Sequence, residues 1–325
     1  MIKIKDFAAS DKEFKECARI DNLVQHDSVN HPDDDKNDWK IRDKSIIHNR
    51  LLLYQNNILI GVIYYSQGRS ENKRTCFYTL HLDPQYNNLG YRKLLYDKML
   101  DRVKNFNCNL VHTSIYNHEN YNEHKKLLEK EGFKLVQTNR EYSCNIIKID
   151  FKRYNPLIRK LENDGIKFYD SKEEMANNNK KFPDHFKKLE ELEWMLEQDI
   201  PIPNGIKHTR MPFEQWQKVC LDFYNNSYGI DIVAVKNKEY IGSTCLEVYS
   251  KADPHKAWTG HLGVIKKFRR KGIATALKIK AIKKLLQKGI KEVRTDNEEN
   301  NPMYKINEKL GFKPVPFSLD YSKEI

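Results

Sequence analysis

The chain repeats itself, and this repeat limits its architecture more than any other feature. The stretch 126–133 reads Lys-Leu-Leu-Glu-Lys-Glu-Gly-Phe, and 305–312 reads Lys-Ile-Asn-Glu-Lys-Leu-Gly-Phe. A second glycine, Gly90 or Gly272, lies 42 residues before the glycine of the first stretch and 39 residues before that of the second. Two markers in the same order at nearly the same spacing indicate a tandem duplication. The 325 residues also suit two domains of ordinary size.

Each half has the same predicted order of elements. Strand-like patterns lie at 50–54, 58–67 and 76–82 in the first half, and at 230–235, 240–249 and 257–264 in the second. In the second half, the spacing of Ala274, Leu277, Ala281 and Leu285 predicts an amphipathic helix that Gly289 ends. A strand at 293–296, a helix at 303–310 and short strands near 313–315 and 318–321 are expected to follow. Strands and helices around a mixed sheet give an α/β (α+β) class.

The domain boundaries follow from the same pattern. We expect a first domain at 1–150, a linker at 151–165 and a second domain at 166–325. Residues 171–228 are predicted to be mostly helical and acidic, with a loop at 201–205. The run 33–35, three aspartates, is expected to be an exposed loop and not a metal site.

Composition excludes several classes of protein. With 39% hydrophobic and 31% charged residues, the chain is neither wholly disordered nor of low complexity. No apolar run approaches the roughly 18 residues of a membrane span, and the N-terminus lacks the apolar core of a signal peptide. The six cysteines lie far apart without a CxxC pair. We therefore expect a cytoplasmic protein with reduced thiols and no zinc.

The net charge of +12 is concentrated in one window. Residues 266–294 hold twelve lysines and arginines against a single acid, Glu292. The lysines within it at 278, 280, 283, 284 and 288 are interpreted as a solvated helix face. The crowding of basic residues at 266–271, just before a glycine, indicates a phosphate-bearing partner, either a nucleotide cofactor or a nucleic acid.

That glycine lies in a turn suited to an anion. The segment 269–274, Arg-Arg-Lys-Gly-Ile-Ala, connects a predicted strand to a predicted helix. Backbone N–H groups and the positive end of the helix dipole then form a site for a pyrophosphate. Gly272 lacks the Cβ that would block a close approach, and Ala274 keeps the helix start small. An ordinary turn with a basic surface is the alternative, whereas a Walker loop and a dinucleotide fingerprint are excluded by their missing residues.

The pattern Arg269-x-x-Gly272-x-Ala274 resembles the Q/R-x-x-G-x-G/A signature of the GNAT superfamily of N-acetyltransferases. The surrounding second half, 166–325, fits the same frame, and the first half fits it more weakly. The resemblance implies a tandem GNAT protein, in which each domain is a mixed, mostly antiparallel sheet flanked by helices. It also implies acetyl-CoA as co-substrate, no metal, and an amine acceptor that is a small molecule or a peptide.

The resemblance also assigns the residues that bind the co-substrate. The strand end would hold the pantetheine arm, the turn would hold the pyrophosphate, and an asparagine after the next strand would meet the cofactor. The corresponding residues are Leu262, Gly263 and Val264, then Arg269, Arg270, Lys271, Gly272, Ile273, Ala274 and Thr275, and finally Asn300. The family mechanism is direct attack of the amine on the thioester, whose carbonyl the strand backbone polarises.

The catalytic acid and base depart from the family pattern. Many members carry a tyrosine three residues before Leu-Gly-Phe as general acid, and here that residue is Asn307, which donates a hydrogen bond but not a proton. Tyr304, one turn earlier, is the candidate substitute. The usual position of a carboxylate base holds Trp258, so Glu247 and His261 are the candidate replacements.

The first half has lost the signature. Asn87 stands where Arg or Gln is expected, and Arg92 stands where a small residue is needed. We expect the Arg92 side chain to crowd a pyrophosphate. The first half is therefore predicted not to catalyse, and to shape the substrate cleft or serve as a structural partner.

Two other functions stay open. Fem-type aminoacyl or peptidyl transferases also pair two GNAT-like folds, and a CoA- or nucleic-acid-binding regulator would need neither acid nor base. The intact turn at 269–274 argues against a Fem-type transferase, which needs no CoA-binding turn. RNA binding that is tight and falls steeply with salt would favour a nucleic-acid function.

Overall fold

The computed structural model describes residues 1–325 except 26–27, 227–228, 249 and 302. The elements of the first half are β1 (Ile2–Asp6), α1 (Asp11–Val24), α2 (Pro32–Ile41), β2 (His48–Gln55), β3 (Ile58–Gln67), β4 (Thr75–Leu82), α3 (Leu89–Lys104), β5 (Leu110–Tyr116), α4 (Asn122–Lys130) and β6 (Lys134–Asn145). Those of the second half are α5 (Asn155–Asn163), β7 (Ile166–Asp170), α6 (His185–Glu197), α7 (Phe213–Asn226), β8 (Ile230–Lys236), β9 (Glu239–Glu247), β10 (Lys256–Val264), α8 (Ile273–Gln287), β11 (Glu292–Glu298), α9 (Tyr304–Lys309), β12 (Lys313–Pro314) and β13 (Ser318–Glu324).

The described strands form one continuous sheet. Its order is β1-β2-β3-β4-β5-β13-β6-β11-β10-β9-β8-β7, with β12 paired to β6. Only β4–β5 and β10–β11 pair in parallel among these strands, so the predicted mixed, mostly antiparallel class is confirmed. The strand predicted at 240–249 ends at Glu247, and residue 249 lies outside the described part of the chain, as do 227–228 of the predicted helical region.

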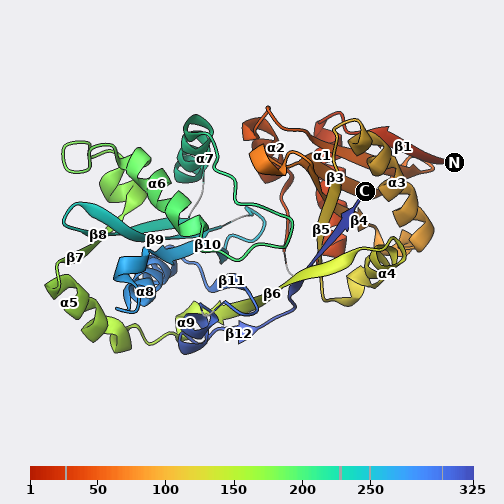
Figure 1. The fold of residues 1–325 in the computed structure, drawn as a ribbon. Helices are drawn as coiled ribbons and strands as arrows, with labels where there is room; N and C mark the ends of the chain where they lie inside the picture. The colour runs from red at the N-terminus through yellow and green to blue at the C-terminus, as the bar shows by residue number, and fades with distance from the viewer. Residues whose placement is uncertain (26–27, 227–228, 249, 302) are drawn as a thin grey trace.

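The two halves exchange strands. The C-terminal strand β13 lies between β5 and β6, where Leu319 is opposite Ile115 on one side and Thr138 on the other. Strand β6 continues past β13 and pairs its second part with β11, with Tyr142 opposite Thr295. The C-terminus therefore lies among the strands of the first half (Figure 1).

The hydrophobic cores follow the same exchange. Leu319 and Tyr321 of β13 are buried in the core of the first half, while Cys144 and Ile146, at the end of β6 and just beyond it, are buried in the core of the second. The ranges 1–150 and 166–325 remain a prediction, but each half depends on a strand that the other supplies.

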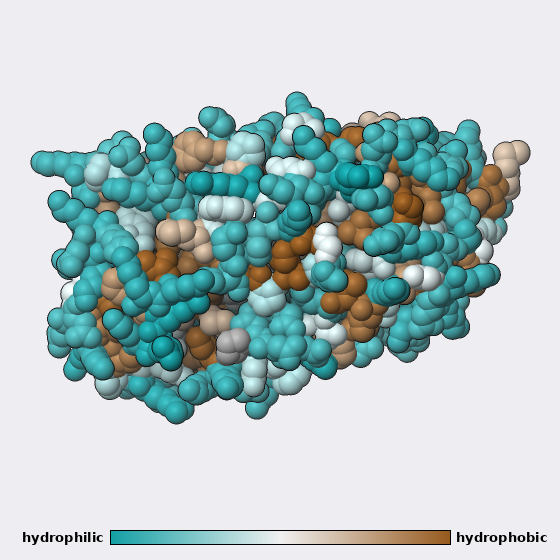
Figure 2. Space-filling model, viewed as in Figure 1, coloured by the Kyte–Doolittle hydropathy of each residue, from teal (hydrophilic) through white to brown (hydrophobic). Residues whose placement is uncertain are grey.

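Helix α8 covers the sheet of the second half. Three residues of its predicted apolar stripe, Leu277, Ala281 and Leu285, are fully buried against the sheet strands. Most of the face shown in Figure 2 is hydrophilic, in keeping with the net charge of +12.

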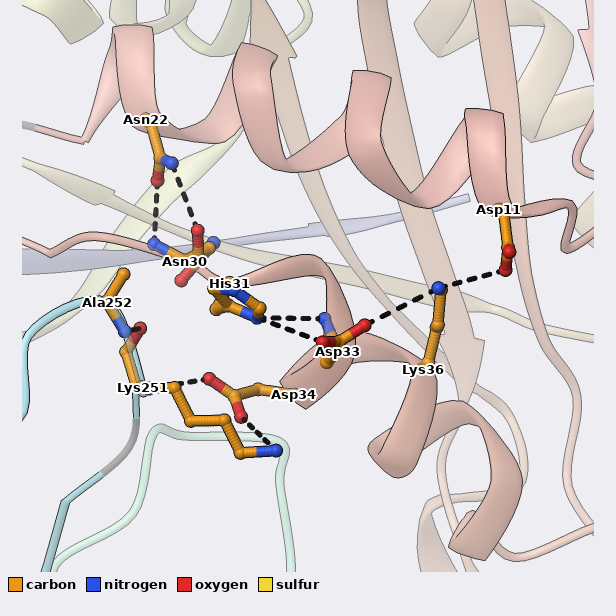
Figure 3. Close-up of polar contacts among 10 residues, drawn as sticks. Asp11, Asn22, Asn30, His31, Asp33, Asp34, Lys36, Lys251 and Ala252 are labelled. Carbon is orange, nitrogen blue, oxygen red and sulfur yellow. Dashed lines mark hydrogen bonds and ion pairs between the residues drawn. The ribbon is translucent and has the colours of Figure 1, made fainter.

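The prediction of an exposed loop at 33–35 is wrong, because these residues form the first turn of α2. Aspartates stabilise a helix N-terminus by interacting with its dipole. Asp34 also connects the halves: it accepts a hydrogen bond from the backbone N–H of Lys251 at 2.8 Å and lies 3.6 Å from that residue's Nζ (Figure 3). Asp33 instead shares Lys36 with Asp11.

Candidate active site

A gap opens between β10 and β11 in the second half. The parallel pairing joins Lys256–Trp258 to the start of β11 and is not continued beyond Trp258 among the described residues. A bulge between Thr259 and His261 follows directly in β10. The gap is a cavity of about 350 Å³. Its walls are Gln137, Asn139, 200–203, Thr259, Gly260, His261, Leu262, Lys278, 295–298, Asn301, Met303 and Asn307.

A second cavity of about 390 Å³ adjoins the first at Met303. Its lining contains seven of the residues predicted to bind the co-substrate. These are Val264, Arg269, Arg270, Gly272, Ile273, Ala274 and Thr275, to which the structure adds Phe268 and Ile306. Leu262 lines the first cavity, whereas Gly263 and Lys271 line neither.

The N-terminus of α8 is open to this second cavity. Gly272 occupies the N-cap position, and no side chain of the described residues caps the first turn. The backbone N–H groups at the helix start are then free to bind an anion, and the helix dipole favours one. The N-terminus of α3 in the first half differs, because Asn88 Oδ1 accepts a hydrogen bond from Tyr91 N at 2.9 Å.

Gly272 has a structural reason beyond the predicted close approach of a ligand. Its φ of +86° lies in the left-handed region that favours glycine. A Cβ at this position would also lie 2.6 Å from Leu157 Cδ1 of α5. The turn therefore needs glycine for its own backbone and for its contact with α5.

The basic residues of the turn divide into two groups. Arg269 donates from Nε to the carbonyl of Val264 at 2.8 Å and pairs with Asp199, so it braces the turn. Lys266 and Lys267 also have carboxylate partners, at 3.3 Å and 2.6 Å. Arg270 forms no ion pair within the described part of the chain and lines the cavity, so its guanidinium is available to an anion.

Arg92 takes the corresponding space in the first half. Its side chain is 1% exposed and donates to Asn87 Oδ1 at 2.9 Å and to the carbonyl of Leu80 at 3.4 Å. Leu80 is the counterpart of Leu262 in the repeat. Burial lowers the pKa of Arg92 to about 10. The guanidinium thus occupies the strand end that borders the cavity in the second half.

A group of acidic side chains lies on the other side of β10. Glu193 of α6 accepts a hydrogen bond from Trp216 Nε1 at 2.8 Å, and its second oxygen lies 3.9 Å from His261 Nε2. Burial and the neighbouring Glu190 and Glu247 raise the pKa of Glu193 to about 7. Sequence reasoning missed Glu193, because only its place in an acidic helix marked it.

Glu247 and Asp231 complete this acidic group. A Cβ on Gly260 would lie 2.7 Å from Glu247 Oε1, so the carboxylate rests against the wall of the first cavity. Burial raises the pKa of Glu247, and it raises the pKa of Asp231 to about 7. One oxygen of Asp231 accepts from Tyr224, and the other is buried without a hydrogen-bond partner among the described residues.

The remaining predicted residues lie at different distances from the cavities. Asn307 is buried and lines the first cavity. Tyr304 is half-buried in the first turn of α9 and is absent from the described linings of both cavities. Asn300 is exposed and bonds to Glu298 at 2.8 Å, while Asn297 and Asn301 are the asparagines of this turn that reach the cavity.

The interpretation of Lys278 as part of a solvated face is wrong. Its residue is 1% exposed, and its Nζ donates to Asn307 Oδ1 at 2.6 Å. Asn307 in turn donates to Asn297 Oδ1 at 2.8 Å. Burial lowers the pKa of Lys278 to about 7. A titratable amine therefore lies inside the cavity wall, where the helix pattern predicted solvent.

Three further findings concern the described residues as a whole. They contain no group of three or more His, Cys, Asp or Glu side chains placed to hold a metal ion. None of their helices combines the length and apolar character needed to cross a bilayer. All six cysteines are free thiols.

Comparison with known families identifies both halves. The model of the acetyltransferase (GNAT) family matches residues 13–133 and again residues 189–312. The chain belongs to the GNAT family. The tandem architecture that the sequence repeat predicted is confirmed, and GNAT proteins as a family are acetyltransferases. The comparison with curated proteins found no match.

Solved structures show the same GNAT fold. A tandem GNAT protein from the clavulanic acid biosynthesis pathway, solved without AcCoA, is 14% identical with a TM-score of 0.77, over 100% of this chain and 98% of that one. A GCN5-related N-acetyltransferase from Sphaerobacter thermophilus is also 14% identical, with a TM-score of 0.67. This match covers 99% of this chain and 95% of that one. A glucosamine N-acetyltransferase region of a fungal β-N-acetylglucosaminidase is 14% identical, with a TM-score of 0.73. This match covers 99% of this chain and 38% of that one.

Proposed function

We propose that this protein is a cytoplasmic, acetyl-CoA-dependent N-acetyltransferase whose C-terminal domain transfers an acetyl group to a primary amine. The observation that carries the proposal is the adjoining pair of cavities in the second half. The open N-terminus of α8 borders one, and the gap between β10 and β11 forms the other. A diphosphate suits the second cavity, at the N-terminus of α8, and an extended arm that ends in a thioester suits the first cavity, between β10 and β11.

The residues present fit this co-substrate. The backbone N–H groups of 270–275 and the guanidinium of Arg270 would hold its phosphates, and the strand end 262–264 would hold its pantetheine arm. When bound, acetyl-CoA supplies an acetyl group activated as a thioester. The side chains around β10 then hold the amine and remove its proton.

The acidic group favours an amine as the acceptor. Burial raises the pKa values of Glu193, Glu247 and Asp231, so these carboxyl groups are suited to accept a proton from an amine and, once ionised, to attract a protonated one. Glu193 and Glu247 are the candidates for removing the proton, because a neutral amine is needed for the attack. His261 lies 3.9 Å from Glu193 and lines the first cavity.

The charge distribution of 266–294 supports this function over nucleic-acid binding. Lys280 pairs with Glu162, and Lys284 with Asp170 and Glu173, so much of the positive window is neutralised locally. A Fem-type transferase or an RNA-binding regulator needs a free basic surface. We therefore expect RNA to bind weakly at physiological salt.

The direct test combines calorimetry with an acceptor panel. We expect one acetyl-CoA site per chain, because Arg92 and Asn88 occupy the corresponding positions in the first half. Release of free thiol should require one of the amines in a panel of small amines, amino acids, amino sugars, polyamines and peptides. A stoichiometry of two acetyl-CoA molecules per chain would contradict the single site in the C-terminal domain. Binding of acetyl-CoA without reaction of any amine in the panel would contradict the proposed acetyl transfer.

Replacement of Glu193 tests the acidic group. With a pKa raised to about 7, the carboxylate accepts a proton only above that pH, so kcat/KM should rise through neutral pH. Glu193→Gln should lower kcat/KM by about 100-fold and remove the rise through neutral pH. Glu191→Gln, exposed on the same helix, is the matched control. An unchanged pH profile in Glu193→Gln would assign proton removal to another group.

A further inference from the structure

Lys278 is a buried amine in the wall of the first cavity. It lies in α8 between two buried apolar residues, Leu277 and Ile279. Its Nζ is 2.6 Å from Asn307 Oδ1 and 4.6 Å from the centre of the Phe312 ring. The cavity that Lys278 lines is the gap between β10 and β11.

The surroundings do not neutralise this cation. Within the described part of the chain Lys278 has no ion pair, and its one hydrogen-bond partner is a neutral amide. The titratable groups that face it are Cys144 of β6 and Asp296 of β11. Burying an ammonium without a paired charge lowers the stability of the folded chain, and an apolar residue would fill the same space without that loss. Such groups are concentrated at functional sites.

Asn307, the hydrogen-bond partner of Lys278, stands at the position where other family members carry their general acid. In the resemblance described above, the position of Asn307 belongs to a tyrosine that protonates the leaving thiolate. The amide of Asn307 has no proton to give, yet its oxygen is held by the ammonium of Lys278 and its nitrogen by Asn297. A proton source therefore lies directly behind the residue that cannot supply a proton.

We propose that Lys278 is the proton donor to the leaving sulfur, and that Asn307 is the residue that positions it. This inference rests on the proposed function. When the amine nitrogen bonds to the acetyl carbon, the carbon–sulfur bond breaks and its electron pair passes to sulfur. The ammonium of Lys278 gives sulfur one proton and becomes a neutral amine, which regains a proton from water. The nitrogen of the attacking amine loses its extra proton to the carboxylate of Glu193 or a neighbouring acidic residue.

The pKa of Lys278 suits this role. Because burial lowers it to about 7, the side chain is partly protonated at neutral pH and exchanges a proton readily. Activity should then fall as Lys278 loses its proton above neutral pH. Together with the rise from Glu193, a bell-shaped profile is expected.

The first experiment compares variants of the full chain. Lys278→Met should bind acetyl-CoA within about threefold of wild type, lower kcat by about 100-fold and lose the falling limb of the pH profile. Lys278→Arg keeps a charge but cannot release a proton near neutral pH, so it should be equally slow. Lys283→Met, exposed on the same helix, is the control. Unchanged kcat in Lys278→Met would overturn the proposal.

A second experiment needs no turnover. The wild-type chain is prepared with isotope-labelled lysine, and the Nζ titration of Lys278 is followed by NMR and assigned by its absence in Lys278→Met. CoA should raise the midpoint by at least about one pH unit, because a thiolate beside Lys278 favours the ammonium, whereas desulfo-CoA should not. Equal midpoints with both ligands would place Lys278 away from the sulfur. If neither ligand binds, the proposed function fails instead.

Discussion

A fragment that begins at residue 160 and ends at residue 325 is expected to be insoluble or to lack a cooperative unfolding transition. The fragment contains the whole co-substrate turn but lacks β6, so β11 loses its neighbour along 292–298. It also lacks β5, so β13 loses both of its partners. Unpaired strand edges invite aggregation.

The loss of packing adds to the loss of strand pairing. Leu319 and Tyr321 would be exposed, because the core that buries them belongs to the first half. Cys144 and Ile146 would be missing from the core of the second half. At about 1.5–3 kcal/mol for each large buried side chain, these changes approach the whole stability of a small domain.

Cleavage of the chain provides the control. Fragments 1–150 and 151–325, expressed together, retain every strand and should purify as one complex, because the exchanged strands hold them together. Solubility, thermal unfolding and co-purification are the measurements. A soluble, cooperatively folded and active 160–325 fragment would show that the exchange contributes little to stability.

Replacement of Ala274 by arginine should abolish acetyl-CoA binding. Ala274 lines the second cavity at the start of α8, and the same position in the repeat holds Arg92, which lies buried against the strand end. An arginine placed there adds volume where the phosphates are expected. We expect the dissociation constant to rise at least about 100-fold, which corresponds to about 2.7 kcal/mol.

Two companion variants separate volume from charge. Ala274→Gln has similar bulk without charge and should lose binding as well, since added positive charge alone would attract phosphates. Gln287→Arg adds the same charge at the exposed end of α8 and should bind normally. Calorimetry measures all three. Wild-type affinity in Ala274→Arg would move the phosphate site away from this turn.

The duplication and the local elements could be predicted from the sequence because they depend on neighbours along the chain. The 3.6-residue spacing of Leu277, Ala281 and Leu285 predicts a helix wherever the chain goes, and these residues are buried as expected. The turn at 269–274 is likewise a local feature, since its glycine adopts a positive φ and begins a helix. The resemblance to the GNAT family rested mainly on the repeat and on the turn at 269–274.

Partner strands were decided only by the tertiary structure. The pattern of residues 134–145 and 318–324 is that of ordinary strands, and nothing in it says which half supplies the neighbour. Two copies of one fold have equivalent sheet edges, and the last strand of each copy could pair with either edge. Which edge it pairs with depends on the packing of the whole chain. An alternating pattern specifies the face of a strand but not its neighbour.

The same limit applies to single polar residues. The sequence pattern places Lys278 on a solvated helix face, yet this residue is buried and lines the first cavity. The pattern places Glu193 on an acidic helix surface, yet its carboxylate lies 3.9 Å from His261, which lines the same cavity. Their burial depends on residues such as Asn307 and His261, which are far away in sequence. The sequence by itself determined the fold family and the glycine turn at 269–274, because local backbone geometry encodes both. The environment of each ionisable group, and so its pKa and role, arose only from contacts between distant segments.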